Sequence, residues 1–585
     1  MVRRASLTAV CMAVSCAAAG LARQLPSTPT PPAFRGIVVK LAATRAESGE
    51  PPAAVVNKLK RRLPGGSGGW RDTQIEGAGA TFELKQVASE SGGGTPMTPA
   101  GAWEAAHTLR KDPAVEYAEP AFAVDGARGE SVELEDCRAG GTRLPESGTA
   151  ADPLMGAVAD SEWSLGPSGA NVLEAWKLFP PGIVPGQGVW IGHPDTGYRF
   201  HREIWMKDGP VRADLGWDFV KAGPDPVDAF EEGTLKNPGH GTRTSSVIVS
   251  PRGRQMSGDS TRGVSGVAPG ARLIPLRVAN GVVQFDQTQL AAAIRDAAGD
   301  DRSRVKQRVD VISISLGGPP SRALKDAVTL AERRGVLVLA AAGNQVKTVV
   351  WPARYDNVIA VAASNVDGKP WTGSSAGSAV DISAPGESVW VASPKAGNPD
   401  PLDCLQMGSG TSYAVATTAG IAALWMARHS GEPAFQALRA SGRQTEAFRR
   451  ILHDNFRSVA AWQTGSFGPG IVDAVKVLNA PLPRIEEAAA ARVDRCSQDL
   501  DALESLFDQA TEPRRRIREL FGKDPCRAAS VADEVAFLYS TDDSVAEAVD
   551  PLTHSSQPSE AEYRRARDAV RQSASKQLRE QLPRR

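Results

Sequence analysis

Residues 309–344 read VDVISISLGGPPSRALKDAVTLAERRGVLVLAAAGN. Two short runs of aliphatic and β-branched residues, 309–316 and 335–342, flank a segment at 321–334 whose apolar residues recur every three or four positions. The runs have the length of buried strands, and the segment between them has the period of an amphipathic helix. Strand, helix and strand in this order predict two parallel strands joined by a crossover, and hence a parallel sheet covered by helices.

The same alternation continues on both sides of this stretch. Further strands are predicted at 188–192, 272–278 and 357–363, and a further helix at about 286–298. Residues 161–480 are therefore predicted to form one α/β domain with a mostly parallel sheet flanked by helices. Such sheets bind ligands outside the carboxyl ends of their strands, so polar residues directly after the strands are candidate site residues.

A smaller domain is predicted before this one, at residues 34–125. Its expected strands are 36–42, 79–84 and 115–122, and its expected helices are 53–63 and 99–111. This order is typical of a small α+β domain of the ferredoxin-like, split βαβ type.

Two segments have a different character. Residues 126–160 are rich in Gly, Glu, Ser and Arg without a regular period, and we interpret them as an exposed linker. Residues 481–585 are charged and rich in Ala, Glu and Arg, which predicts a helical extension. Its basic runs, Arg514–Arg516 and the final EYRRARDAVRQSASKQLREQL, are expected to be solvated helix faces.

The first 22 residues have the features of an export signal. Arg3 and Arg4 precede an apolar run to Leu21, with small residues before a cleavage point. A membrane anchor, or lipid attachment at Cys16, is the alternative interpretation. Because no other apolar stretch approaches the ~18 residues of a membrane span, we expect a secreted, periplasmic or extracellular protein without stable membrane insertion.

Net charge and cysteine content limit the partners, disulfides and metal sites that we expect. Lys plus Arg and Asp plus Glu both count 67, so no net charge attracts nucleic acid, and no nucleic-acid partner is expected. Of the six cysteines, four remain after the signal. An even set in an exported protein favours disulfides, and of the three pairings we expect Cys496 with Cys526. None of the four has CxxC spacing, which argues against zinc.

Five short motifs place reactive or polar side chains beside predicted strands and helices. Alone, each has a structural interpretation, such as a turn-forming Asp, a glycine turn or an N-cap Ser. The motifs are HPDTGY with Asp195, NPGHGTRTSS with His240, SLGG at Ser315, Leu316, Gly317 and Gly318, AAAGN with Asn344, and SGTSYAVATTAGIAAL with Ser412.

Together and in this order, the motifs resemble the subtilase family of serine proteases, whose triad runs Asp, His, Ser. The resemblance extends to GVAPGARLIPLRV (266–278), VIAVAAS (358–364), DISAPG (381–386) and GPGIVDAVKVL (468–478). DPAVEYAEPAF (112–122) resembles the end of the subtilisin propeptide. Two departures are His193 and Pro194, where the family has apolar residues, and Tyr413, Val415 and Ala416 where the family has GTSMAAP.

The resemblance implies a serine endopeptidase made as a zymogen and acting on polypeptides. Asp195, His240 and Ser412 would form the triad, and Asn344 would bind the oxyanion with the Ser412 backbone N–H. The backbone of residues 315–318 would pair with an extended substrate. Residues 34–125 would be a propeptide that inhibits its own chain, and we expect its end, residues 119–124, to enter the cleft.

No cofactor is required by this chemistry. A structural calcium ion is suggested by related loops in some subtilases, here Asp218, Asp225 and Asp228 in GWDFVKAGPDPVD (216–228); a solvated acidic loop is the alternative. Two other functions compete with this interpretation. An α/β-hydrolase esterase requires the order Ser, Asp, His and is excluded by chain order. A catalytically inactive subtilase-fold binding module is opposed by the complete set of reacting residues.

Overall fold

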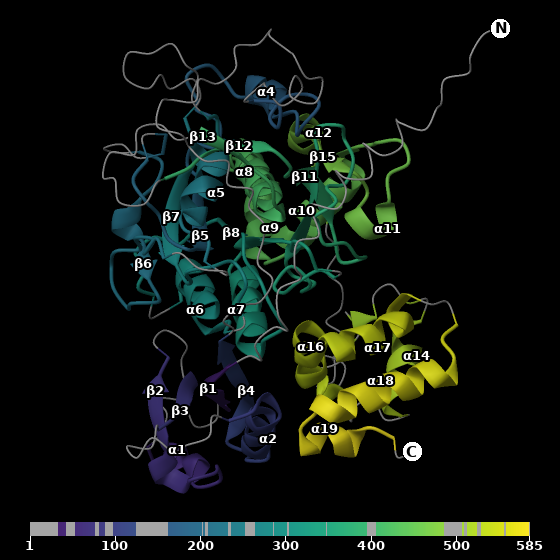
Figure 1. Cartoon of the computed structure of the whole chain (residues 1–585). Helices are drawn as coiled ribbons and strands as arrows, with labels where there is room; N and C mark the ends of the chain where they lie inside the picture. Colours follow the sequence, from purple (N-terminus) through teal and green to yellow (C-terminus); the bar gives the residue numbers. More distant parts are fainter. Residues whose placement is uncertain are drawn as a thin grey trace, which may run out of the picture.

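The computed structural model (Figure 1) contains an N-terminal α+β domain, a large α/β domain and a C-terminal helical domain. The expected signal peptide at 1–22, the linker at 126–160 and all four remaining cysteines lie outside the described residues. The structure describes residues 33–42, 53–75, 81–87, 97–123, 162–201, 203–204, 209–231, 236–251, 264–284, 286–300, 303–346, 348–394, 405–484, 503, 506–507, 510, 512–522, 528–554 and 557–583.

The N-terminal domain, residues 33–123, has the predicted ferredoxin-like fold. Its four strands form one antiparallel sheet in the order β2-β3-β1-β4, with two helices in the connections. Its elements are β1 (Ala33–Leu41), α1 (Ala53–Lys60), the 3₁₀ helix η2 (Gly66–Gly69), β2 (Trp70–Gln74), β3 (Thr81–Gln86), α2 (Pro99–Arg110) and β4 (Val115–Ala123).

The expectation that residues 119–124 enter the cleft is wrong for the part that the structure describes. β4 pairs with β1 from Leu41↔Val115 to Ala33↔Ala123, so the strand stays in the sheet of its own domain to its last residue. The antiparallel ladder supplies partners for the backbone of β4, which a short crossing into another domain would forfeit.

The α/β domain is built on a sheet of nine strands in the order β14-β15-β11-β10-β9-β8-β5-β7-β6. All neighbours are parallel except the pair β14 and β15, which confirms the predicted mostly parallel sheet. A separate hairpin, β12 with β13, lies beside it. The strands are β5 (Trp190–Asp195), β6 (Trp217–Asp218), β7 (Arg272–Arg277), β8 (Val311–Ile314), β9 (Leu337–Ala341), β10 (Ile359–Ser364), β11 (Ile382–Pro385), β12 (Val389–Ala392), β13 (Leu405–Gly408), β14 (Phe456–Arg457) and β15 (Ile471–Val472).

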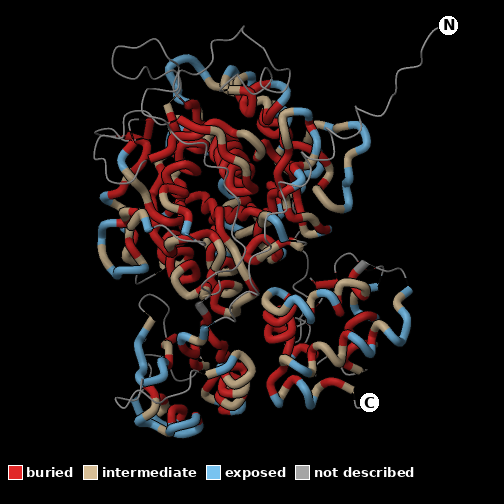
Figure 2. Tube along the Cα trace, viewed as in Figure 1, coloured by how far each residue is buried: buried red, intermediate tan, exposed pale blue. Residues whose placement is uncertain are grey.

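Helices cover both faces of this sheet (Figure 1), and the centre of the domain is buried (Figure 2). The strands alternate their side chains between two cores, one on each face. Val311 belongs to the core under α5 and α8, whereas Ile312 belongs to the core under α6 and α7. The helices are α4 (Val172–Ala175), η3 (Trp176–Leu178), η4 (Ala213–Leu215), α5 (His240–Val249), α6 (Thr288–Ala297), α7 (Arg322–Arg333), α8 (Thr411–His429), α9 (Pro433–Ala440), α10 (Gln444–Asp454), α11 (Thr464–Phe467) and α12 (Ala474–Asn479).

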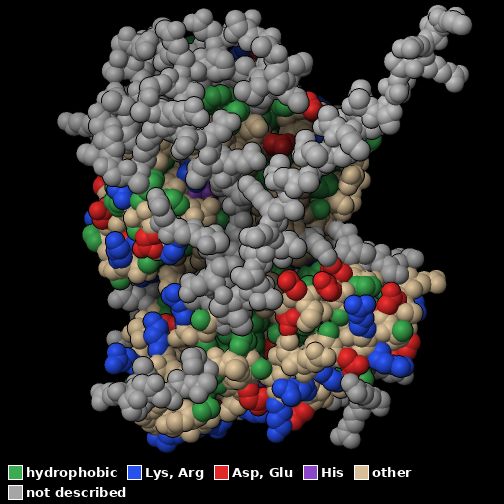
Figure 3. All heavy atoms as spheres, viewed as in Figure 1, with side chains coloured by type: hydrophobic (Ala, Val, Ile, Leu, Met, Phe, Trp, Pro, Cys, Tyr) green, Lys and Arg blue, Asp and Glu red, His purple; other side chains and the backbone are tan. Residues whose placement is uncertain are grey.

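The C-terminal domain, residues 503–583, is helical as predicted. It comprises α14 (Pro513–Phe521), α16 (Ala532–Thr541), α17 (Asp543–His554), α18 (Glu560–Ser573) and α19 (Lys576–Gln581). Charged side chains of both signs are interspersed over the face of this domain seen in Figure 3. The prediction that the basic runs are solvated helix faces does not hold for Arg516. Its side chain is buried and donates to Tyr563 Oη at 3.1 Å. Among the described residues, no helix combines the length and apolar character needed to cross a bilayer.

Candidate active site

Asp195 and His240 are joined by a hydrogen bond of 2.7 Å between His240 Nδ1 and Asp195 Oδ1. Asp195 is the last residue of β5, and His240 is the first residue of α5. Gly241 explains why the two segments lie so close. A Cβ added there would be 2.0 Å from the Gly197 carbonyl oxygen, so only glycine allows the start of α5 to press against the turn behind Asp195.

The Asp195 carboxylate is fully buried, and burial by itself opposes its ionisation. Nearby His240 and His193 and the Thr196 N–H, which donates to Oδ1 at 2.7 Å, outweigh burial and lower the pKa of Asp195 below its ordinary value. The carboxylate is therefore ionised at neutral pH and holds the proton of His240 on Nδ1.

His193 lies on the other side of the same carboxylate. Its Nε2 is 3.7 Å from Asp195 Oδ2 and 3.1 Å from Thr244 Oγ1. Burial lowers the pKa of His193 to about 4, although the Asp195 charge opposes this shift, so His193 is neutral at physiological pH. In the sequence His193 stood out only as a departure from the family pattern, and its chemical contact with Asp195 was missed.

Ser412 lies in the first turn of α8 and is buried. Its Oγ donates to the Ser315 carbonyl oxygen at 3.3 Å, and Ser315 Oγ donates to the Ser412 carbonyl oxygen at 3.2 Å. First-turn N–H groups have no acceptor within the helix, and the dipole makes this end positive. The helix that carries Ser412 packs against α5, which carries His240.

Asn344 follows β9 and is tied to the residue before Ser412. Its Oδ1 accepts from Thr411 N at 2.9 Å and from Thr411 Oγ1 at 2.8 Å. With the amide oxygen oriented by Thr411, the amide nitrogen is the end of the side chain that can donate to a substrate oxygen.

Within residues 315–318, the backbone groups of Gly317 and Gly318 are already paired within the chain. Gly317 exchanges bonds with the 282–284 segment: its N–H donates to Val282 O at 3.0 Å, and Gln284 N–H donates to Gly317 O at 2.8 Å. Gly318 and Trp351 exchange N–H···O bonds of 2.9 and 3.1 Å. A substrate strand that paired here would have to replace some of these bonds.

Two of the three residues suggested for calcium, Asp218 and Asp228, are already engaged by donors of the protein itself. Asp218 accepts from two backbone N–H groups and from Arg277 at 2.6 Å. Asp228 accepts from Thr196 Oγ1 at 2.6 Å, Phe230 N at 2.7 Å and Gly239 N at 2.9 Å. Within the described ranges, no group of three His, Cys, Asp or Glu side chains is placed to hold a metal.

Asp228 contacts the two turns that adjoin Asp195 and His240. Thr196 follows Asp195 and Gly239 precedes His240, so one buried carboxylate ties together the two turns that carry the hydrogen-bonded pair. No sequence pattern indicates this role, because Asp228 stands 32 residues from Thr196.

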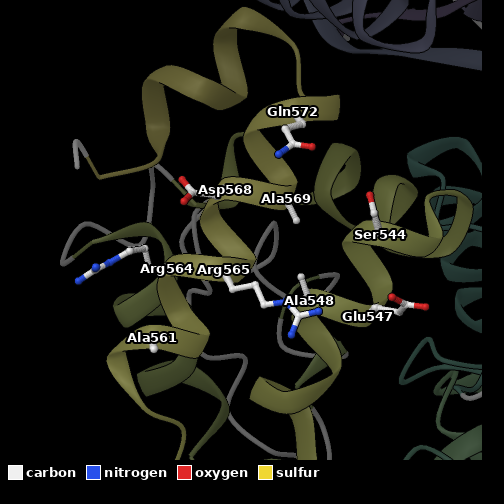
Figure 4. Close-up of a pocket in the computed structure, with 9 residues that line it drawn as sticks. All are labelled: Ser544, Glu547, Ala548, Ala561, Arg564, Arg565, Asp568, Ala569 and Gln572. Carbon is white, nitrogen blue, oxygen red and sulfur yellow. The ribbon is translucent and has the colours of Figure 1, made fainter.

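A hollow of about 530 Å³ lies elsewhere, between α17 and α18 of the C-terminal domain (Figure 4). It is lined by side chains of mixed charge, including Glu547, Arg564, Arg565 and Asp568. It contains none of the candidate catalytic residues, so its size does not make it the active site.

Comparison with known proteins adds to this geometry. A family described as the subtilase family matches residues 186–454, which include Asp195, His240, Asn344 and Ser412. The chain is 30% identical over 321 residues to thermitase from Thermoactinomyces vulgaris, covering 54% of this chain and 96% of that protein. It is 34% identical over 269 residues to subtilisin DY from Bacillus licheniformis, covering 45% and 85%.

One solved structure bears on the fold alone. Fervidolysin from Fervidobacterium pennivorans, described as a keratinolytic enzyme related to subtilisin, aligns with a TM-score of 0.50 at 18% identity. The alignment covers 79% of this chain and 63% of that one.

Proposed function

The chain belongs to the subtilase family of serine endopeptidases, and from this premise we propose that it cleaves polypeptides with Asp195, His240 and Ser412 after being made as a zymogen. The observation that carries the proposal is the buried 2.7 Å hydrogen bond between His240 and Asp195, on elements that pack beside the helix bearing Ser412.

In the first step, His240 Nε2 removes the proton of the Ser412 hydroxyl as Oγ attacks the scissile carbonyl carbon. Ionised Asp195 keeps the other imidazole proton on Nδ1 and stabilises the imidazolium that forms. The protonated His240 then gives its proton to the leaving amine, which leaves an acyl group on Ser412. Water, deprotonated by His240, hydrolyses this acyl-enzyme and restores Ser412.

The tetrahedral intermediates carry a negative oxygen. The Asn344 amide nitrogen and the Ser412 backbone N–H, at the positive end of α8, are the donors proposed for it. The bonds from Thr411 to Asn344 Oδ1 support this assignment because they fix the amide before any substrate arrives.

Substrates are proposed to bind as an extended strand along residues 315–318. Main-chain pairing is largely blind to side-chain identity, which favours an endopeptidase of broad sequence preference. Binding requires the Val282–Gln284 segment to give up at least part of its pairing with Gly317. No cofactor takes part in these steps.

Residues 34–125 are proposed to be the inhibitory propeptide. Buried Glu119 accepts from Ser321 Oγ at 2.8 Å, Arg322 N at 2.8 Å and Ala323 N at 3.3 Å, which are the first groups of α7. A carboxylate at a helix N-terminus is stabilised by the dipole. These bonds support a domain built to dock on the enzyme. Export by the segment 1–22 and a Cys496–Cys526 disulfide complete the proposal.

A serine-directed fluorophosphonate tests the function directly. Wild-type protein should be labelled and should hydrolyse casein, whereas Ser412→Ala should do neither and should remain folded. Removal of one triad member leaves only a small residue of activity, so a variant that keeps more than about a tenth of it contradicts the assignment. Absence of label on folded, processed wild type would favour an inactive binding module.

A further inference from the structure

The C-terminal domain contacts the N-terminal domain through an apolar core that the two domains share. Phe122 of β4 stacks on Phe537 of α16 with ring centroids 4.5 Å apart and an angle of 24°. Trp103 of α2 lies 6.0 Å from the same ring. All three side chains are buried and belong to one cluster with residues of the C-terminal helices. Such stacked, desolvated aromatic contacts are the usual anchors of an interface.

Polar contacts of the same interface are buried and directional. His107 Nε2 lies 2.8 Å from Glu534 Oε2, and both side chains are almost fully shielded from solvent. Burial lowers the pKa of His107, although the Glu534 hydrogen bond opposes this shift, so the imidazole is neutral at neutral pH. Its Nε2–H then donates a hydrogen bond to the Glu534 carboxylate. At one edge of the same interface, the Gln577 N–H donates to Glu104 Oε2 at 3.2 Å.

This interface uses other residues of the N-terminal domain than the contact with the α/β domain, although Trp351 of the α/β domain belongs to the same apolar cluster. The N-terminal domain meets α7 through Glu119, and Tyr117 and Ala121 enter the core under α6 and α7. It meets the C-terminal domain through α2 and Phe122. Figure 1 shows both neighbours beside the N-terminal domain, with α7 above its sheet and α16 and α19 on the side of α2.

One carboxylate joins all three domains. Asp533 of α16 accepts from Arg322 of α7 at 2.8 Å and from Arg110 of α2 at 3.4 Å. Burial opposes ionisation of Asp533, but the two arginines together hold its pKa below the ordinary value. Arg110 also donates to Ser530 O at 3.3 Å. The C-terminal domain is therefore fixed to the enzyme at the point where it holds the N-terminal domain.

We propose that the C-terminal domain is a second binding site for the N-terminal domain, which keeps the severed fragment on the enzyme after the linker at 126–160 is cut. The proposal rests on the proposed zymogen function, and the partner is the fragment of residues 33–123 of the same chain. A fragment held by two surfaces rebinds at one while the other remains attached, so its escape is much slower than from either alone. The onset of activity is then set by loss of this fragment and not by the cut.

The test uses the full chain and no catalysis. A recognition site for an added protease is inserted in the linker of the Ser412→Ala protein, a dye is attached to the N-terminal domain, and the chain is cut. Dissociation of the fragment after dilution is followed by fluorescence anisotropy. Because the cut is made externally, the result does not depend on self-processing; failure of the proposed function would appear separately, as absent self-cleavage of wild type.

Phe537→Ala should release the fragment at least tenfold faster, because it removes the central ring of the interface. His107→Ala should also accelerate release, and it leaves the C-terminal domain unaltered in sequence, so it decides the matter if Phe537→Ala perturbs folding by circular dichroism. Arg515→Ala is the matched control, because this exposed side chain pairs with Glu512 and Glu519 of its own domain. Release from both His107→Ala and folded Phe537→Ala at a rate within twofold of the control would overturn the proposal.

Discussion

His193 Nε2 lies 3.7 Å from Asp195 Oδ2, on the carboxylate oxygen opposite the one that His240 contacts. Asp195 thus stands between two buried imidazoles. Because His193 is neutral, the site carries one negative charge for the single imidazolium that the proposed mechanism creates at His240.

This arrangement predicts a pH dependence of stability. The pKa of His193 is about 4 in the folded chain and 6.5 unperturbed, so between these values the unfolded chain binds more protons and stability falls as pH falls. The contribution is fully present above about pH 6.5, and about 2 kcal/mol of it should be lost between pH 7 and pH 5.

His193→Val should remove this loss. In the Ser412→Ala background, which avoids autolysis, thermal unfolding at pH 7 and pH 5 should show a smaller decrease in Tm for the valine variant. Any cavity left by valine lowers Tm at both pH values and cancels in the comparison. Equal decreases in the two proteins would mean that His193 is not the titrating group.

Asn344→Ala should lower kcat by about 10²-fold or more with little change in KM, because the oxyanion exists only along the reaction path. Asn344→Asp is the matched variant. It keeps an oxygen for the Thr411 donors but has no amide hydrogen, so it should lose kcat while keeping the Tm that alanine lowers. An effect limited to KM in both variants would refute the oxyanion role.

Gly241→Ala should lower both stability and activity. Its Cβ would lie 2.0 Å from a backbone oxygen, so the start of α5 must shift, typically at a cost of about 1–3 kcal/mol, and His240 shifts with it. Gly431→Ala is the control, since nothing lies within 4 Å of its added Cβ. Normal kcat/KM in Gly241→Ala would show that this contact does not position His240.

Asp228→Ala should reduce kcat/KM without any response to calcium. The carboxylate holds Thr196 and Gly239, so its removal loosens both turns of the site. Chelator should leave the Tm of wild type unchanged, and added calcium should not restore the variant. A drop in the wild-type Tm on chelation would reopen the metal interpretation of the 216–228 loop.

Maturation should depend on Ser412. Wild type should lose about 13 kDa beyond its expected signal, the mass of some 120 residues, by cleavage in the segment predicted to be a linker. Ser412→Ala should keep its precursor mass in a protease-free preparation. Mass spectrometry decides the matter: trimming of the alanine protein in the linker at the wild-type rate would rule out self-processing.

The sequence predicted the sheet because its central strands are buried on both faces and therefore read as continuous apolar runs. β2, in contrast, was missed. It is an edge strand with one buried residue, Trp70, and four exposed polar ones, so it has neither an apolar run nor an alternation. Sequence periodicity reports burial, and an edge strand with so little burial gives no period to detect.

The sequence predicted those residues of the candidate site that lie within recognisable motifs. The bond between Asp195 and His240 follows from two motifs at the ends of predicted elements. Asp228 could not be assigned in this way, because its role comes from contacts that depend on the closeness of separate turns. His193 stands on β5 only two residues before Asp195, but no motif indicated that its ring lies beside the carboxylate. The prediction that Arg516 is solvated rested on its charge alone. The sequence does not show that the Tyr563 hydroxyl accepts its hydrogen bond inside the domain.

The pair formed by His107 and Glu534 spans 427 positions of the chain. Residues so far apart cannot meet until everything between them has been synthesised, and the entropy cost of closing so long a loop makes this contact one of the last to form. The N-terminal domain can dock on α7 while the C-terminus is still absent, whereas its contact with α16 forms only on a finished molecule. A chain cut short by premature termination would therefore carry the whole α/β domain with a weaker hold on the N-terminal domain.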